Sequence, residues 1–128
     1  MAASPITALL LIAHGSRRHE ANADLDYLAA QLRRREAYPI VQTSYLELTD
    51  PTIADAAAAC VTAGARRVIL LPYFLSAGVH VREDLADARI ELARSFPDVE
   101  FLLAEPLGRH PLLEEVVLRR AKEVTNDE

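Results

Sequence analysis

Histidines and one carboxylate follow apolar segments of this chain, where side chains of these types could bind a metal or move a proton. These residues are His14, Glu47, His80 and His110. Imidazole nitrogens with a carboxylate suit a divalent transition metal such as cobalt, nickel, iron or zinc, whereas magnesium and calcium prefer more oxygen ligands. The residue types therefore suggest transition-metal chemistry. They do not form a compact ligand motif such as HExxH in the sequence.

Apolar runs of strand length alternate with helical patterns along the chain. The expected strands cover residues 7–13, 40–46, 68–72 and 99–104, and the expected helices cover 18–36, 50–64, 81–96 and 111–124. This βαβαβαβα order predicts one α/β domain over residues 1–128, with a four-stranded parallel sheet and helices on both faces. The first and third strands are continuously apolar and belong in the middle, so the predicted strand order is 2-1-3-4, as in flavodoxin-like folds.

Local signals add detail to this plan. Asp50 followed by Pro51 is typical of a helix start, with the aspartate as the N-cap. In the second strand, Gln42 and Ser44 alternate with larger residues, which indicates a half-exposed edge strand. Cys60 lies in an alanine-rich run with no histidine near it in sequence, so we expect it to pack inside a helix interface.

Composition excludes several classes of protein. The 128 residues are 51% hydrophobic and 26% charged, which is typical of a folded domain, and the net charge of −5 argues against nucleic-acid binding. The apolar runs are far shorter than the roughly 20 residues of a membrane span, and no basic segment precedes one at the start. We therefore expect a cytoplasmic protein without a membrane or nucleic-acid partner.

The carboxyl ends of parallel strands share one edge of the sheet, so the predicted topology gathers the histidine segments there. Glu105, after the fourth strand, joins them, and His19 at the start of the first helix could lie near. Other interpretations stay open. The segment from His14 could be an anion-binding turn, His80 and His110 could cap helices, and the carboxylate at position 47 could be solvated or paired.

Arginines lie beside the histidine segments. They are Arg17, Arg18, Arg82 and Arg109. Guanidinium groups pair with carboxylates and phosphates in bidentate fashion, so these arginines could receive an anion with several such groups. The alternative is that they pair with acidic residues nearby in sequence, namely Glu20, Glu83, Asp84 and Glu114.

Four linked motifs resemble the CbiX-like sirohydrochlorin chelatases. They are LIAHGSR (11–17), YLELTDPTI (45–53), LPYFLSAGVHVREDL (71–85) and PLGRHPL (106–112), and together they cover nearly the whole chain. The resemblance implies a class II tetrapyrrole chelatase that inserts a divalent metal into sirohydrochlorin or a related precorrin, without ATP or an organic cofactor. Cobalt leads to cobalamin and is the first expectation, iron leads to siroheme, and nickel leads to the methanogen cofactor.

The resemblance also assigns roles to residues. It implies that His14 and His80 hold the metal and take up protons, and Glu47 matches the family's glutamate in position. Sirohydrochlorin carries eight carboxylates, which gives the neighbouring arginines a purpose. The expected substrate contacts are Arg17, Arg82, Ser16 and Gly78. Chelatases of this class have two α/β lobes, so a chain of 128 residues is expected to supply one lobe and to form a homodimer.

Two other classes of function stay open. Histidine phosphatases also place His-Gly after the first strand and use the histidine as a nucleophile, but they carry arginine directly before it, where this chain has Ala13. A non-catalytic metal or tetrapyrrole carrier would share the fold, and it would bind sirohydrochlorin without accelerating metal insertion.

Overall fold

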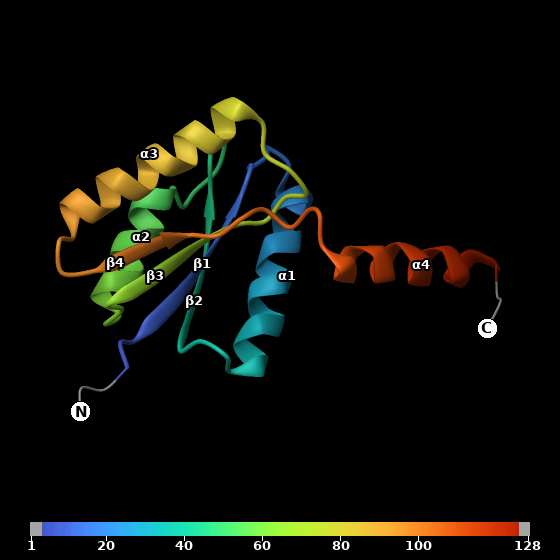
Figure 1. The fold of residues 1–128 in the computed structure, drawn as a ribbon, viewed down its shortest axis with the longest axis horizontal. Coiled ribbons are helices and arrows are strands. Elements are labelled where there is room, and N and C mark those ends of the chain that lie inside the picture. The colour runs from blue at the N-terminus through green and yellow to red at the C-terminus, as the bar shows by residue number, and fades with distance from the viewer. Residues whose placement is uncertain (1–3, 126–128) are drawn as a thin grey trace.

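The computed structural model of the chain describes residues 4–125 as four strands and four helices in strict alternation (Figure 1). The strands are β1 (Thr7–Ala13), β2 (Ile40–Tyr45), β3 (Arg67–Pro72) and β4 (Glu100–Leu103). The helices are α1 (His19–Arg35), α2 (Ile53–Thr62), α3 (Val79–Ser95) and α4 (Pro111–Thr125). All strand pairs are parallel and the sheet order is β2-β1-β3-β4, which confirms the predicted α/β fold.

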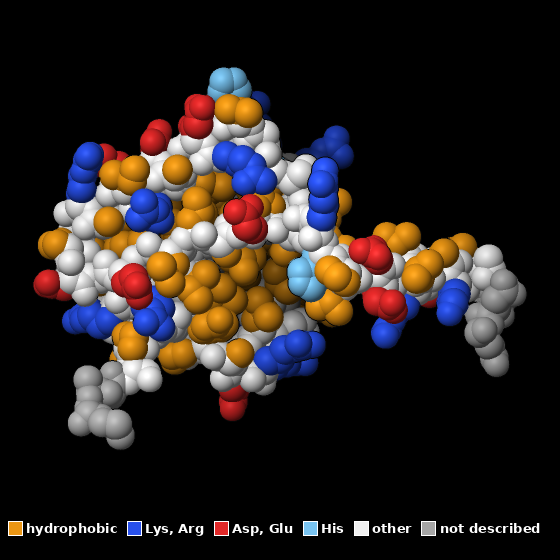
Figure 2. Space-filling model, viewed as in Figure 1, with side chains coloured by type: hydrophobic (Ala, Val, Ile, Leu, Met, Phe, Trp, Pro, Cys, Tyr) orange, Lys and Arg blue, Asp and Glu red, His pale blue; other side chains and the backbone are white. Residues whose placement is uncertain are grey.

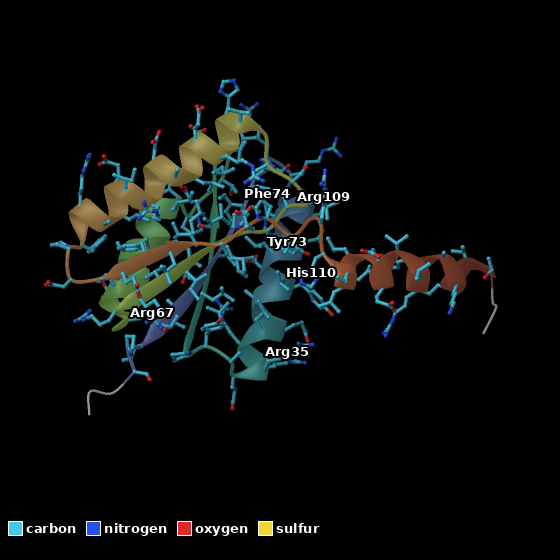
Figure 3. The ribbon with its side chains drawn as sticks, viewed as in Figure 1. Arg35, Arg67, Tyr73, Phe74, Arg109 and His110 are labelled. Atoms are coloured by element: carbon cyan, nitrogen blue, oxygen red, sulfur yellow. The ribbon has the colours of Figure 1, made fainter. Side chains whose placement is uncertain are left out.

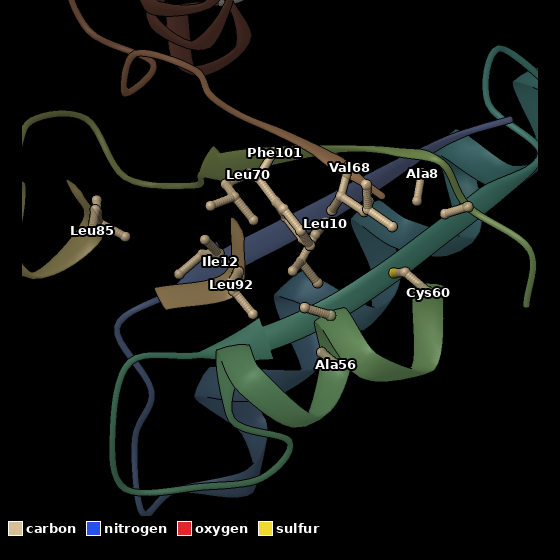
Figure 4. Packing of buried hydrophobic residues seen from close by; sticks show 13 residues of the cluster. Ala8, Leu10, Ile12, Ala56, Cys60, Val68, Leu70, Leu85, Leu92 and Phe101 are labelled. Atoms are coloured by element: carbon tan, nitrogen blue, oxygen red, sulfur yellow. The ribbon is translucent and has the colours of Figure 1, made fainter. Parts of the chain in front are cut away.

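One face of the sheet is closed by α2 and α3. Side chains alternate between the two faces of a strand, so Leu10 and Ile12 of β1 point to this side together with Leu70 of β3. They belong to one cluster of buried side chains with Cys60 of α2 and Leu85 of α3 (Figure 4). Cys60 is buried in this cluster, which confirms its predicted packing role, and burial raises the pKa of its thiol to about 11.

The other face is closed over only half of its width. Leu25 and Ala29 of α1 bury Leu9 and Leu11 of β1 and Val41 of β2. Over β3 and β4 the same face stays open, and Figure 2 shows a broad hydrophobic surface between the last strand and α1. The sheet therefore has one closed face and one half-open face.

Helix α4 stands away from the rest of the chain (Figure 1). None of its residues is buried, so α4 covers neither face of the sheet within this chain, and the helices on the two faces are α1 on one side and α2 with α3 on the other. The segment before α4 explains its direction. Leu107 donates its backbone N–H to the Phe74 carbonyl at 3.0 Å, and Gly108 donates to the Leu75 carbonyl at 2.8 Å, so the chain follows the loop after β3 outward.

Two predictions are corrected. The second helix begins at Ile53 rather than at Pro51, because the hydroxyl of Thr52 accepts the N–H of Asp55 at 3.1 Å and thereby caps the helix. Ser44 is buried rather than exposed, because α2 covers that side of β2 and the hydroxyl donates to the Leu11 carbonyl at 3.0 Å. The edge position of β2 is confirmed.

Candidate functional site

The segments that follow the strands lie side by side at one edge of the sheet. Glu47 donates its N–H to the His14 carbonyl at 3.1 Å, which joins the segments after β2 and β1. Tyr73 donates to the Ile12 carbonyl at 2.7 Å, which joins the segment after β3 to the end of β1. The segment after β4 is joined to the loop after β3 by the backbone hydrogen bonds of Leu107 and Gly108. The structure thus gathers these segments as the predicted topology requires.

His14 lies exposed at this edge, and its imidazole is stacked on the ring of Phe74, with centroids 4.4 Å apart and planes inclined at 29°. Within residues 4–125 the imidazole makes no hydrogen bond, so its nitrogens are open to a metal or a proton. A hollow of about 240 Å³ opens beside it, lined by residues of the His14 loop, the start of α1 and Tyr73. Figure 3 shows Tyr73 and Phe74 together at the end of β3.

Gly15 gives the His14 loop its shape. Its φ of +96° lies in the left-handed region, where side chains are strained. A Cβ at this position would collide with the carbonyl oxygen of Glu47 and would lie 3.3 Å from Cβ of Tyr45. The two loops therefore approach each other as closely as they do only because residue 15 is glycine.

Asn22 of α1 holds the same loop from the other side. Its Oδ1 accepts the N–H of Ser16 at 3.0 Å, and its Nδ2 donates to the Ser16 carbonyl at 2.7 Å. The hydroxyl of Ser16 accepts the N–H of Arg18 at 3.0 Å. Tyr45 donates its hydroxyl to the Asn22 carbonyl at 3.1 Å, and burial, together with the nearby charge of Asp26, raises the pKa of that phenol. Ser16 thus takes part in the architecture of the loop.

Sequence reasoning missed the roles of Asn22 and Tyr45. The signal for Asn22 is an asparagine close to a helix start, where such side chains bond to nearby backbone groups. No sequence signal identifies the Tyr45 hydroxyl, because its bond crosses from β2 to α1 and depends on the packed fold.

His80 lies in a different setting. It is the second residue of α3 rather than part of the preceding loop, and it is exposed. Gly78 precedes the helix, and a Cβ built there would meet nothing within 4 Å. Within residues 4–125, no three side chains of histidine, cysteine, aspartate or glutamate form a group that could hold a metal ion. The described chain therefore does not assemble His14, His80 and Glu47 into one ligand set by itself.

Arg82 is engaged by its own chain. Its guanidinium pairs with Glu105 at 3.2 Å, and its Nε donates to the Ala77 carbonyl at 3.1 Å. The acidic partner thus comes from the segment after β4 and is neither Glu83 nor Asp84. Both groups of the ion pair are largely exposed, so solvent can compete for them.

His110 has a capping role. Its Nδ1 accepts the backbone N–H of Leu112 at 3.1 Å, at the start of α4, which agrees with one of the open interpretations. His19 is the first residue of α1 and is exposed, as is Arg17 just before it. No helix within residues 4–125 is long and apolar enough to cross a membrane.

The fold and this edge define an α/β lobe with one four-stranded parallel sheet and a candidate site at the carboxyl ends of its strands. The chain superposes on the crystal structure of the sirohydrochlorin chelatase SirB from Bacillus subtilis subspecies spizizenii in complex with cobalt. The TM-score is 0.84 and the identity is 26%, over 92% of this chain and 50% of that chain. The crystal structure of a CbiX protein from Marinobacter aquaeolei VT8 matches with a TM-score of 0.81 and 27% identity, over 94% of this chain and 98% of its own.

Sequence comparison is more specific. Residues 8–124 match the CbiX family. The chain is 38% identical over 109 residues to the chloroplastic sirohydrochlorin ferrochelatase of Arabidopsis thaliana, covering 85% of this chain and 48% of that protein. The chain therefore belongs to the CbiX family. It spans about half the length of several curated relatives that it matches, whereas the Marinobacter protein is matched over nearly its whole length.

Proposed function

We propose that this chain is a sirohydrochlorin chelatase, which inserts a divalent metal into the tetrapyrrole without ATP or an organic cofactor. Cobalt is the first candidate for the metal substrate, for cobalamin synthesis, and iron or nickel are the alternatives. The observation that carries this proposal is the exposed His14 imidazole, held beside an open hollow in a chain that matches the CbiX family from residue 8 to 124. The relatives named for sirohydrochlorin chelation support it.

Metal insertion makes two chemical demands on the protein. Two pyrrole N–H protons must leave the macrocycle while the metal exchanges water for nitrogen ligands. Imidazole suits both demands, because it binds transition metals when neutral and its ordinary pKa lies near physiological pH. The metal must also be released to the macrocycle, so two or three protein ligands with open positions serve better than a closed tetrahedral cage.

We assign the metal and the protons to His14 and His80, with Glu47 as an oxygen ligand. His14 is the fixed member, because Phe74 supports its ring and Gly15 fits its loop against the next one. His80 is exposed in the first turn of α3, just after Gly78, which has open space around it. Since the described chain does not bring the three side chains into one ligand set, we place their approach in the complex with substrate.

The substrate contacts that we propose are Arg17, Arg82, Ser16 and Gly78. Arg17 is exposed beside the His14 loop and can meet a substrate carboxylate directly. Arg82 would exchange its pairing with Glu105 for a substrate carboxylate. The contribution of Ser16 is through the shape of its loop, and that of Gly78 is the open space at the start of α3.

We also propose a homodimer that works in the cytoplasm. A chelatase made of two lobes encloses its macrocycle between them, and this chain supplies one lobe. The edge that carries His14 is open in the single chain, so a second copy facing it would complete the cleft. The half-length match to the Arabidopsis relative and the nearly full-length match to the Marinobacter protein are both compatible with this arrangement.

The test is an anaerobic absorbance assay with sirohydrochlorin and cobalt, iron or nickel ions. We expect the protein to accelerate the spectral change of metal insertion well beyond the spontaneous rate measured without protein. Binding of sirohydrochlorin with no acceleration by any of the three metals would identify a carrier and refute the proposal. Hydrolysis of a phosphate ester, lost on His14→Ala, would identify the phosphatase alternative.

A further inference from the structure

A second hollow lies at the same edge of the sheet as His14. It has a volume of about 410 Å³ and lies between the loop after β3, the start of α3 and the segment after β4. We call it the arginine hollow, and its lining consists of Leu75, Ser76, Arg82, Pro106, Gly108 and Arg109. Two of these residues are arginines and none is acidic, although the whole chain has a net charge of −5. The hollow is therefore a basic concavity in an acidic chain.

The backbone on two sides of the arginine hollow is held in place. Leu107 and Gly108 donate their N–H groups to the carbonyls of Phe74 and Leu75, at 3.0 Å and 2.8 Å. A Cβ on Gly108 would collide with the Leu75 carbonyl, so glycine at this position allows the two backbones to lie this close. The ring of Phe74 in turn stacks on the imidazole of His14. The hollow thus has a defined position relative to the proposed metal ligand.

Arg109 has no partner among the residues that the structure describes. It is exposed, and within residues 4–125 its guanidinium makes no ion pair or hydrogen bond. It lies on the segment that leads into α4 (Figure 3). A guanidinium group has several N–H donors in one plane and keeps its positive charge at physiological pH. Arg109 can therefore offer its donors to a bound anion without giving up a contact of its own.

Arg82 lies between the arginine hollow and a smaller one. Its Nε donates to the Ala77 carbonyl at 3.1 Å, and one of its terminal nitrogens pairs with Glu105 at 3.2 Å. Glu105 lines the smaller hollow, of about 130 Å³, but not the arginine hollow, whereas Arg82 lines both. The side chains of the ion pair are 54% and 82% exposed, so an incoming carboxylate can take the place of Glu105.

We propose that the arginine hollow binds one ionised carboxylate side chain of the macrocycle, which Arg82 and Arg109 hold jointly. The ion pair with Glu105 shows that the guanidinium of Arg82 accepts a carboxylate partner at this place. Glu105 occupies Arg82 until the substrate arrives. This inference rests on the proposed function, and it adds Arg109 as the second anchor of the same carboxylate.

The walls of the hollow favour a side chain of a large apolar ligand over a free inorganic anion. Leu75 is 64% exposed, and Pro106 lines the same hollow. Apolar walls beside two guanidinium groups suit a ligand that combines an apolar ring with ionised side chains. A free phosphate would meet the arginines but would leave Leu75 in water, so it lacks a contact that the macrocycle can make.

The first experiment measures the binding of metal-free sirohydrochlorin to the full chain by anaerobic fluorescence titration. Arg109→Gln removes a charge from the hollow, and the control Arg34→Gln removes the same charge from the last turn of α1, at the opposite edge of the sheet. We expect the dissociation constant to rise roughly tenfold for Arg109→Gln and to stay unchanged for Arg34→Gln. Arg109→Lys should give a smaller rise, because lysine keeps the charge but lacks the planar fork. Wild-type affinity in Arg109→Gln would overturn the proposal.

A double-mutant cycle tests whether the two arginines hold the same carboxylate. Arg82→Gln alone should raise the dissociation constant severalfold, less than Arg109→Gln, because Arg82 must first release Glu105. The rise in the double variant should be smaller than the product of the two single rises, because a carboxylate that has lost one anchor is held less well by the other. A rise equal to that product would show that the arginines contact separate groups, and would overturn joint binding.

Inorganic phosphate is the competing source of an anion. The titration is repeated with sodium phosphate and with sodium chloride at equal ionic strength. We expect both salts to weaken sirohydrochlorin binding to the same extent. Stronger competition by phosphate that disappears in Arg109→Gln would identify the hollow as a site for free phosphate, and would overturn the proposal.

These titrations contain no metal, so their result is independent of the rate of metal insertion. A protein whose sirohydrochlorin binding depends on Arg109 but which accelerates no insertion would refute the proposed function alone. A protein that inserts metal and binds sirohydrochlorin equally well as wild type and as Arg109→Gln would refute this inference alone.

Discussion

The segments that carry His14 and His80 follow neighbouring strands but are built differently: His14 lies in a loop after β1, and His80 lies in the first turn of α3. The His14 loop is held on three sides: by the stacked ring of Phe74, by the close approach of Gly15 to the Glu47 carbonyl, and by the paired bonds of Asn22. Each contact restricts the position of the imidazole. A group whose position is restricted in this way can act without first being ordered by substrate.

The start of α3 has no comparable support. Gly78 has open space around it, and the side chain of His80 is exposed and makes no hydrogen bond or ion pair within residues 4–125. Arg82, two residues after His80, forms an exposed ion pair with Glu105. The comparison shows that one histidine is preorganised and the other is free to adjust, which suits a site that must first accept a large substrate and then release its metal.

The largest expected effect is on catalysis by the two histidines. We expect His14→Ala to lower the rate of cobalt insertion by about a hundredfold or more, because it removes the group that we propose as the fixed base and ligand. His80→Ala should cost less, about tenfold, because other ligands can replace a group that is not held in place. The anaerobic absorbance assay measures both, and a greater loss for His80→Ala would reverse the comparison.

Substitutions at Gly15 and Gly78 test whether the His14 loop is held more tightly than the start of α3, with the free energy of unfolding as the measure. Gly15→Ala should lower the free energy of unfolding by about 2–3 kcal/mol, because its Cβ collides with a backbone carbonyl at a positive φ. Gly78→Ala should change it by less than about 0.5 kcal/mol, since the new methyl group meets nothing. Urea unfolding of both variants is the measurement. Equal stabilities would show that the His14 loop is not tightly held.

Variants of the ion pair between Arg82 and Glu105 distinguish a role of Arg82 in substrate binding from a role in structure. We expect Arg82→Gln to raise the KM for sirohydrochlorin severalfold, since it removes a partner for a substrate carboxylate. Glu105→Gln breaks the same ion pair but leaves the guanidinium available, so it should leave KM unchanged or lower it. If both variants raise KM equally, the ion pair matters for structure and Arg82 does not contact the substrate.

The smallest effect concerns Tyr45. Its pKa is raised in the folded chain, so the unfolded chain loses the phenol proton first, and stability must fall as pH rises above about 10. Tyr45→Phe should therefore reduce the loss of stability at alkaline pH. At neutral pH it should lower the free energy of unfolding by about 1 kcal/mol, because the hydrogen bond to the Asn22 carbonyl is lost. Urea unfolding at neutral and alkaline pH tests this. An unchanged alkaline fall would assign it to other groups, among them Cys60.

The strand order was predictable because residues 8–13 of β1 and 68–72 of β3 are all apolar, whereas the other two strands mix polar and apolar residues. The gathering of the histidine segments at one edge followed from that order. The bond between the Tyr45 hydroxyl and α1 could not be predicted, because it joins segments that meet only after packing. The same holds for the ion pair of Arg82, whose partner is 23 residues away in sequence.

The position of α4 was beyond sequence reasoning for another reason. A stripe such as that of Leu112 and Val116 shows that one side of a helix seeks an apolar partner, but not whether the partner belongs to the same chain. The backbone bonds at Leu107 and Gly108, which direct the helix outward, are between main-chain groups and leave no mark in side-chain types. Only the folded chain could reveal an uncovered helix beside an uncovered sheet.

Chemical rescue tests the central claim most directly, namely that the imidazole of His14 takes part in metal insertion. The assay measures cobalt insertion into sirohydrochlorin by His14→Ala with and without added imidazole, beside wild type. We predict a large loss of rate without imidazole and a partial, concentration-dependent recovery with it, while the wild-type rate stays unchanged. A His14→Ala protein that inserts cobalt at the wild-type rate without imidazole would contradict the account.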